Sequence, residues 1–162
     1  MNNMAHAVLR LLEKNKIDYT LVEHPAVFNM EELYAQGLEH CDAIAKNLLV
    51  RDQKKRFYWL LVLYGEKRAD LKALKARLGH GALSFAGAEE LAELLGLTPG
   101  SVTPFGVLND KEHRVTLLLD EDYRGKLIGV HPNDNTATVW LPADALVELL
   151  RQQGTTVEFI PF

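Results

Sequence analysis

The chain has 162 residues and a formal net charge of -4, with 48% hydrophobic and 25% charged residues. That length and composition suit one folded domain with a buried core and exclude a disordered chain. No apolar run approaches a membrane span, the single cysteine cannot form an internal disulfide, and no cysteine and histidine cluster has zinc-site spacing. We therefore expect one domain over residues 1–162, located in the cytoplasm, with no bound metal.

The first part of the sequence predicts a helix, a strand and a second, shorter helix. Apolar residues at helical spacing follow Asn2 and Asn3, either of which can cap a helix. Residues 18–23 alternate as in a strand, and the His-Pro pair that follows stops it. Asn29 and the glutamate three residues later form a capping-box pattern, which predicts a helix over residues 30–36.

The middle of the sequence predicts a central hairpin followed by two helices. Two apolar runs flank a polar turn, and the second run is nearly continuous. A basic amphipathic helix stops at Gly79 and a further helix stops at Gly96, because glycine favours the position after a helix. The expected elements are strands at 43–51 and 56–64, a helix at 70–78, a short strand at 82–85 and a helix at 88–95.

The last part predicts a strand, a second hairpin, a helix and a final strand. Pro132 and the polar residues after it form the turn of the hairpin, and Pro142 suits the first turn of the helix. Helices scattered among hairpins predict an α/β fold, a single domain with a mixed, largely antiparallel sheet flanked by helices. The expected elements of this part lie at 115–119, 127–130, 136–141, 143–152 and 156–160.

The stretch Gly96 to Gly106 contains three glycines and two prolines, so it cannot continue the preceding helix. Pro99 and Gly100 suit the two central positions of a type II turn, with Gly100 at positive φ. Ser101 and Thr103 place hydroxyl groups beside backbone amides, a combination that can hold an ester, a ribose or a phosphate. A purely structural connection between a helix and a strand is the alternative reading of this loop.

Polar residues that interrupt apolar strands are the main candidates for chemistry. Lys46 and Asn47 lie inside an apolar run, and at strand period their side chains point to opposite faces. A lysine there can hold a phosphate or stabilise developing negative charge, or it can simply occupy an open sheet edge. His131 follows a strand and can either contact a ligand or pack. Cys41 has no recognisable catalytic partner and is more simply interpreted as an unreactive cysteine.

Basic residues gather in two segments, although the chain as a whole is acidic. Such a concentration can contact a limited number of phosphates, whereas a solvated charged surface is its commoner meaning. The first segment contains Arg51, Lys54, Lys55 and Arg56, and the second contains Lys67, Arg68, Lys72, Lys75 and Arg77.

Four blocks of sequence carry a family resemblance, although the chain lacks G-x-S-x-G, P-loop and dinucleotide-binding motifs. The blocks are H-P-A-V-F at 24–28, A-K-N-L-L-V-R-D at 45–52, G-L-T-P-G-S-V-T-P-F-G-V-L-N-D at 96–110 and G-V-H-P-N-D-N-T-A-T at 129–138. Together they resemble the freestanding editing proteins related to the insertion domain of bacterial prolyl-tRNA synthetase. The subgroup they resemble is the ProX type, the alanyl-tRNA(Pro) deacylases, rather than the YbaK type. Ala45 departs from that subgroup, which often has threonine there.

The resemblance implies a single α/β domain that hydrolyses the ester between a wrong amino acid and the 3′ adenosine of tRNA. By position, Lys46 corresponds to the family's essential lysine, which holds the terminal nucleotide or the reacting ester. Asn47 and His131 would line the aminoacyl pocket, and no metal or organic cofactor is implied. The family's loop would comprise Gly96, Pro99 and Gly100, with Ser101 beside the substrate.

The same resemblance gives the basic segments a function, since an editing protein must hold the acceptor end of tRNA(Pro). The expected phosphate contacts are Arg51, Lys54, Lys72 and Lys75. Prolyl-tRNA synthetase is a further candidate partner. Three other functions stay open at this point: a Cys-tRNA(Pro) deacylase on the same scaffold, a tRNA-binding module without catalysis, and a small-molecule-binding protein.

Overall fold

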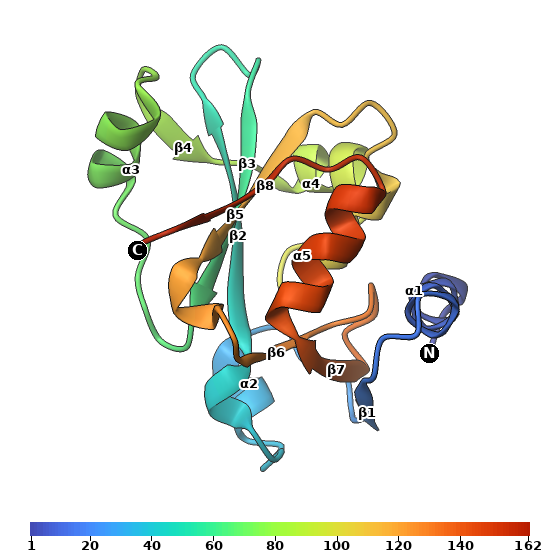
Figure 1. Cartoon of the computed structure of the whole chain (residues 1–162). Coiled ribbons are helices and arrows are strands. Elements are labelled where there is room, and N and C mark those ends of the chain that lie inside the picture. The colour runs from blue at the N-terminus through green and yellow to red at the C-terminus, as the bar shows by residue number, and fades with distance from the viewer.

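The computed structural model describes residues 1–162 as two β-sheets surrounded by helices (Figure 1). A five-stranded sheet has the order β4-β2-β3-β5-β8, and a three-stranded sheet has the order β1-β7-β6. The strands are β1 (Thr20–Glu23), β2 (Ala45–Asp52), β3 (Tyr58–Tyr64), β4 (Leu83–Phe85), β5 (Val115–Asp120), β6 (Leu127–Val130), β7 (Ala137–Pro142) and β8 (Val157–Ile160).

Strand pairing confirms the predicted α/β fold with a mixed sheet. In the larger sheet β4, β2 and β3 pair antiparallel, while β3, β5 and β8 pair parallel. The smaller sheet is antiparallel throughout. Both predicted hairpins are present, as β2 with β3 and β6 with β7. The strands are divided between two sheets, however, where the sequence indicated one, because alternation within a strand does not reveal which partner it will have.

The helices begin and end close to the predicted positions, because the residue types that cap helices occur at their ends. Side chains of Asn2, Asn29 and Asp70 accept hydrogen bonds from the first turns of α1, α2 and α3. The helices are α1 (Asn3–Lys14), α2 (Met30–Tyr34), α3 (Leu71–Leu78), α4 (Ala88–Leu95) and α5 (Ala143–Gln152). Three short 3-10 helices had no counterpart in the sequence analysis: η1 (Cys41–Ala43), η2 (Pro104–Asn109) and η3 (Glu121–Tyr123).

Three groups of buried side chains hold these elements together. The largest has 28 residues and joins α1, α4 and α5 to both sheets. A second group packs α3 on the opposite face of the larger sheet, through Leu74 against Val50 and Trp59. The third lies beneath α2, where an isolated bridge between Ile44 and Gly129 connects the two sheets. None of the helices has the length and apolar character that a membrane crossing requires.

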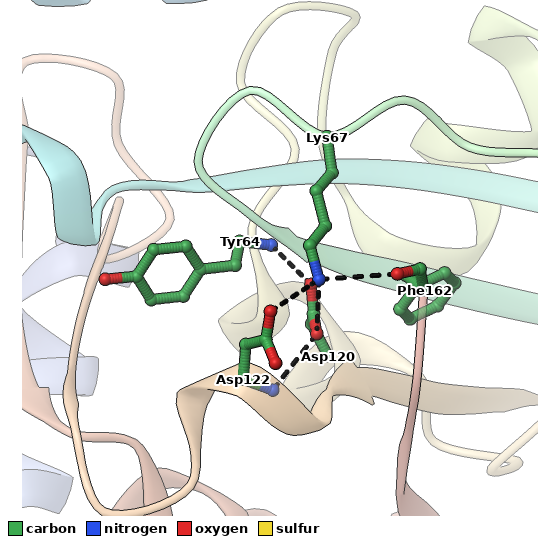
Figure 2. A network of polar contacts seen from close by, with 5 residues as sticks. All are labelled: Tyr64, Lys67, Asp120, Asp122 and Phe162. Carbon is green, nitrogen blue, oxygen red and sulfur yellow. Dashed lines mark hydrogen bonds and ion pairs between the residues drawn. The ribbon is translucent and has the colours of Figure 1, made fainter.

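A buried carboxylate fastens the end of β5 to the segment after β3 (Figure 2). Asp120 is fully buried, accepts hydrogen bonds from the amides of Tyr64 at 3.0 Å and Asp122 at 3.1 Å, and pairs with Lys67 Nζ at 2.9 Å. Lys67 also contacts the Asp122 carboxylate at 2.7 Å and the carbonyl oxygen of Phe162 at 3.4 Å. Burial acts to lower the pKa of Lys67, but the two carboxylates outweigh it and raise that pKa. The network therefore holds the chain terminus against the sheet.

Replacing Asp120 with alanine is expected to lower the free energy of unfolding by about 3 kcal/mol, because two backbone amides and an ammonium group lose their common partner. Urea denaturation measures this change. Asp122→Ala is the matched control, since its carboxylate contacts the same ammonium group but its side chain is 54% exposed. We expect a much smaller loss there. Equal losses in the two variants would contradict the importance of burial.

Candidate functional site

A cavity of about 320 Å³ lies where the two sheets meet, at the start of β2 and the end of β6. That volume is near the lower end of the range for small-molecule sites, about 300 to 1,000 Å³. Its walls come from α2 and the residues before it, from the first half of β2, from the loop after α4 and from strands β6 and β7. Segments distant in sequence thus enclose one space.

The first half of β2 brings Lys46 and Asn47 to the cavity together. β4 pairs only with Val50 to Asp52, so the beginning of β2 is an open edge of the sheet on that side. Neighbouring side chains on opposite faces can both line a cavity that lies across such an edge. Lys46 takes part in none of the five salt bridges of the protein and makes no side-chain hydrogen bond. Its ammonium group is available to a ligand.

Asn47 presents an unused hydrogen-bond acceptor. Its Nδ2 donates to the carbonyl oxygen of Ala45 at 3.3 Å, while its Oδ1 is buried without a partner. A buried acceptor left without a donor costs about 1 to 3 kcal/mol, so native proteins seldom keep one without a reason. The position of Asn47 in the cavity wall therefore favours a ligand that carries an N–H or O–H group.

His131 contributes a neutral ring to the same cavity. Its Nδ1 lies 2.8 Å from the carbonyl oxygen of Ala137 and must carry the proton, because a carbonyl oxygen only accepts. Nε2 is then an acceptor without a partner in the protein. Burial lowers the pKa of His131 below its ordinary value, outweighing the opposite effect of the Ala137 carbonyl. At neutral pH the imidazole therefore offers a lone pair to the cavity, not a positive charge.

The loop after α4 closes the cavity through a tight turn. The amide of Ser101 donates to the carbonyl of Thr98 at 3.1 Å and Gly100 has φ +85°, which confirms the predicted type II turn. A Cβ atom on Gly100 would lie 2.4 Å from the carbonyl oxygen of Phe28, so only glycine allows this approach. Gly100 and Val102 line the cavity, and their amides make no hydrogen bond within the protein.

Three residues predicted for the site lie away from this cavity. Gly96 ends α4 at φ +66° and faces the side chain of Asn109, while Pro99 is exposed at the tip of the turn. The hydroxyl of Ser101 donates to the Thr98 carbonyl at 2.9 Å and is buried. Gly96 and Pro99 thus form part of the loop, as expected, but neither they nor Ser101 line the cavity, which this loop reaches through Gly100 and Val102.

The four basic residues expected to contact phosphates differ in their availability. Arg51 pairs with Glu90 at 3.1 Å and donates to the carbonyl of Asp52, and its side chain is only 19% exposed. Internal partners thus occupy Arg51. Lys54 on the β2–β3 turn and Lys72 and Lys75 on α3 are exposed and form no salt bridge, so these three remain free for an anionic partner.

Two further residues of the cavity wall escaped the sequence analysis. Phe28 lines the cavity just before α2, and Thr138 lines it from β7, where its hydroxyl is 2.9 Å from Nε2 of His24. Both positions fall within blocks of sequence that carried the family resemblance, and that was the signal available for finding them. No group of three or more histidine, cysteine or carboxylate side chains has a geometry suited to a metal ion.

Comparisons with known proteins show the family to which the chain belongs. Residues 24–149 match the family of aminoacyl-tRNA editing domains. The chain is 41% identical over 155 residues to the prolyl-tRNA editing protein ProX of Acetoanaerobium sticklandii, covering 95% of this chain and 94% of that protein. It is 35% identical over 150 residues to prolyl-tRNA synthetase associated domain-containing protein 1 of Danio rerio, covering 90% and 81%.

A solved structure extends the likeness to three dimensions. A crystal structure assigned to a trans-editing enzyme for prolyl-tRNA synthetase matches with a TM-score of 0.71 and 26% identity, covering 100% of this chain and 99% of that one. The resemblance recognised from four blocks of sequence is thereby confirmed. The chain belongs to the family of aminoacyl-tRNA editing domains.

Proposed function

We propose that the chain, acting as one editing domain over residues 1–162, hydrolyses the ester of Ala-tRNA(Pro) and so releases wrongly attached alanine. One observation carries the proposal: a free ammonium group, two unpaired acceptors and two unpaired backbone amides surround a single small cavity. An aminoacyl ester has the complementary groups, namely a carbonyl oxygen that becomes negative and an α-ammonium group that donates.

Size explains why such an activity is needed. A synthetase pocket that admits proline cannot exclude the smaller alanine, since each missing methylene is worth only about 1 to 3 kcal/mol. A second cavity that accepts a methyl side chain and excludes the pyrrolidine ring would complete the selection, because overpacking is costly. The editing reaction then removes alanine without attacking Pro-tRNA(Pro).

Each polar group of the cavity has a role in this mechanism. Water attacks the ester carbon, and the Lys46 ammonium, with the amides of Gly100 and Val102, stabilises the negative charge that develops on the carbonyl oxygen. Asn47 Oδ1 and His131 Nε2 accept hydrogen bonds from the α-ammonium group and fix its position. The carbon–oxygen bond to the ribose breaks, the ribose oxygen takes up the proton that the attacking water gives up, and the adjacent free hydroxyl of the same ribose assists this transfer.

The tRNA partner requires a surface beyond the cavity. Lys54, Lys72 and Lys75 are free cations on an otherwise acidic protein and are suited to phosphates of the acceptor arm. Arg51 would contribute only if it left Glu90. Prolyl-tRNA synthetase, which supplies the mischarged tRNA, is the natural neighbour of this reaction, and the cytoplasm is where tRNA charging takes place.

Deacylation of tRNA(Pro) charged separately with alanine, cysteine, serine and proline tests this function. We expect rapid release of alanine and no release of proline by the wild-type protein. Preferential release of cysteine would instead assign a Cys-tRNA(Pro) deacylase. Binding of every tRNA with no release over a long incubation would contradict catalysis and leave a tRNA-binding module.

A further inference from the structure

An exposed aromatic ring lies on the sheet face beside the cavity. The side chain of Phe85 is 53% exposed, although it belongs to a strand. Phe85 is directly opposite Val50 of β2, so both side chains lie on the same face of the sheet. That face also holds Leu48 and, two residues earlier, Lys46. About half of the side chain is therefore open to solvent, and burying that part against a partner would be favourable.

The position of Phe85 connects it to the cavity. Leu48, two residues before the partner of Phe85, is itself part of the cavity wall. Diagonal neighbours of this kind on adjacent strands are about 7 to 8 Å apart, within reach of an aromatic side chain. A molecule that leaves the cavity along this face would therefore meet the phenyl ring first.

The helix that packs on the same face carries positive charge. α3 packs on this face of the sheet and contacts β4, as Figure 1 shows. It carries the exposed Lys72 and Lys75, neither of which has an acidic partner. An aromatic platform followed by free cations is the arrangement that binds single-stranded nucleic acid, with bases stacked on rings and phosphates near cations. The same order would not be expected for an apolar protein partner.

We propose that Phe85 stacks on the base of the second-last nucleotide of tRNA and so guides its unpaired 3′ end from α3 into the cavity. This inference rests on the proposed function, because it takes the terminal nucleotide to be in the cavity beside Lys46. Phe85 is then a positioning residue that contributes to binding, while the ester itself is hydrolysed by the groups already described.

The test uses an uncharged acceptor-stem minihelix with fluorescent pyrrolocytosine as its second-last nucleotide. Stacking on Phe85 is expected to quench the fluorescence when the wild-type protein binds. Phe85→Ala should abolish the quenching and weaken binding about tenfold, and Phe85→Trp should restore both. In deacylation, Phe85→Ala should raise KM about tenfold and leave kcat nearly unchanged.

Phe57 provides a matched control on the same sheet face. Its side chain is 46% exposed, but it packs against His80, just beyond the C-terminal end of α3. Phe57→Ala should leave the quenching unchanged. Charge reversal at Lys72 and Lys75 should weaken binding and reduce its salt dependence, yet leave the quenching at saturation intact.

Several outcomes would overturn the inference while the proposed function stands. They are undiminished quenching in Phe85→Ala, or full restoration by Phe85→Leu, which is apolar but not aromatic. Loss of binding to prolyl-tRNA synthetase with unchanged binding of the minihelix would make Phe85 a protein contact instead. Conversely, quenching by a wild-type protein that releases no amino acid would retain the stacking and refute the deacylase.

Discussion

Lys46→Ala is expected to slow the hydrolysis of Ala-tRNA(Pro) by about a hundredfold or more, while the protein stays folded. The ammonium group has no partner inside the protein, so its removal leaves no buried charge or hydrogen bond unsatisfied. Removal of one group that stabilises an oxyanion typically costs a hundredfold to a thousandfold in rate. Single-turnover deacylation with excess protein measures the chemical step directly, and thermal unfolding monitors the fold.

Two other variants show what part of the lysine matters. Lys46→Arg keeps the positive charge but changes its shape, and we expect partial activity, because a planar guanidinium group cannot occupy the place of an ammonium group. Lys111→Ala removes an exposed lysine away from the cavity and should have no effect. Normal single-turnover rates in Lys46→Ala would refute the assigned role of Lys46, whatever the other variants do.

Gly100→Ala is expected to have the second large effect, a loss of about a hundredfold in deacylation. The new Cβ atom would lie 2.4 Å from the carbonyl oxygen of Phe28 and 3.0 Å from its carbonyl carbon, so one of two cavity walls must move. The positive φ of Gly100 adds strain. A displacement of about 1 Å in a reactive geometry can cost a hundredfold in rate. The assay is again single-turnover release of alanine.

Gly125→Ala separates the clash from the strain. Gly125 has φ +71°, and a Cβ atom there would meet nothing within 4 Å. We expect both variants to lose some stability in urea denaturation, since alanine resists positive φ, but only Gly100→Ala to lose activity. Equal activity in the two variants would show that the contact between the loop and Phe28 does not shape the site.

Much of the fold could be predicted because its signals are local. Asn29 caps a helix, Gly79 and Gly96 end helices, and a polar turn separates the two halves of the central hairpin. Each of these signals depends on residues only a few positions apart, so it can be read from the sequence without knowledge of the tertiary contacts. The division of the strands into two sheets depends on contacts between distant segments, and no local pattern reports it.

The candidate site could likewise be predicted only where its signals are local. Lys46 stood out because a charge inside an apolar run needs an explanation, and Gly100 because a turn required positive φ. Ser101 was expected beside the substrate, but its hydroxyl found a nearer partner in the backbone of Thr98. Arg51 was expected at a phosphate, but folding brings Glu90 to it from a helix 39 residues away. Competition from a partner within the protein cannot be seen in the sequence.

The beginning of β2, which has no strand partner on the β4 side, also bears on the tendency of the protein to self-associate in concentrated solution. A strand with unused amides and carbonyls invites another chain to add to it, and a lysine at such a position is one of the ordinary safeguards against aggregation. Lys46 would then prevent strand addition at this edge as well as stabilise the negative charge that develops on the ester. Variants with an uncharged residue at this position should accordingly be checked for self-association. A loss of activity caused by aggregation would otherwise be mistaken for a loss of catalysis.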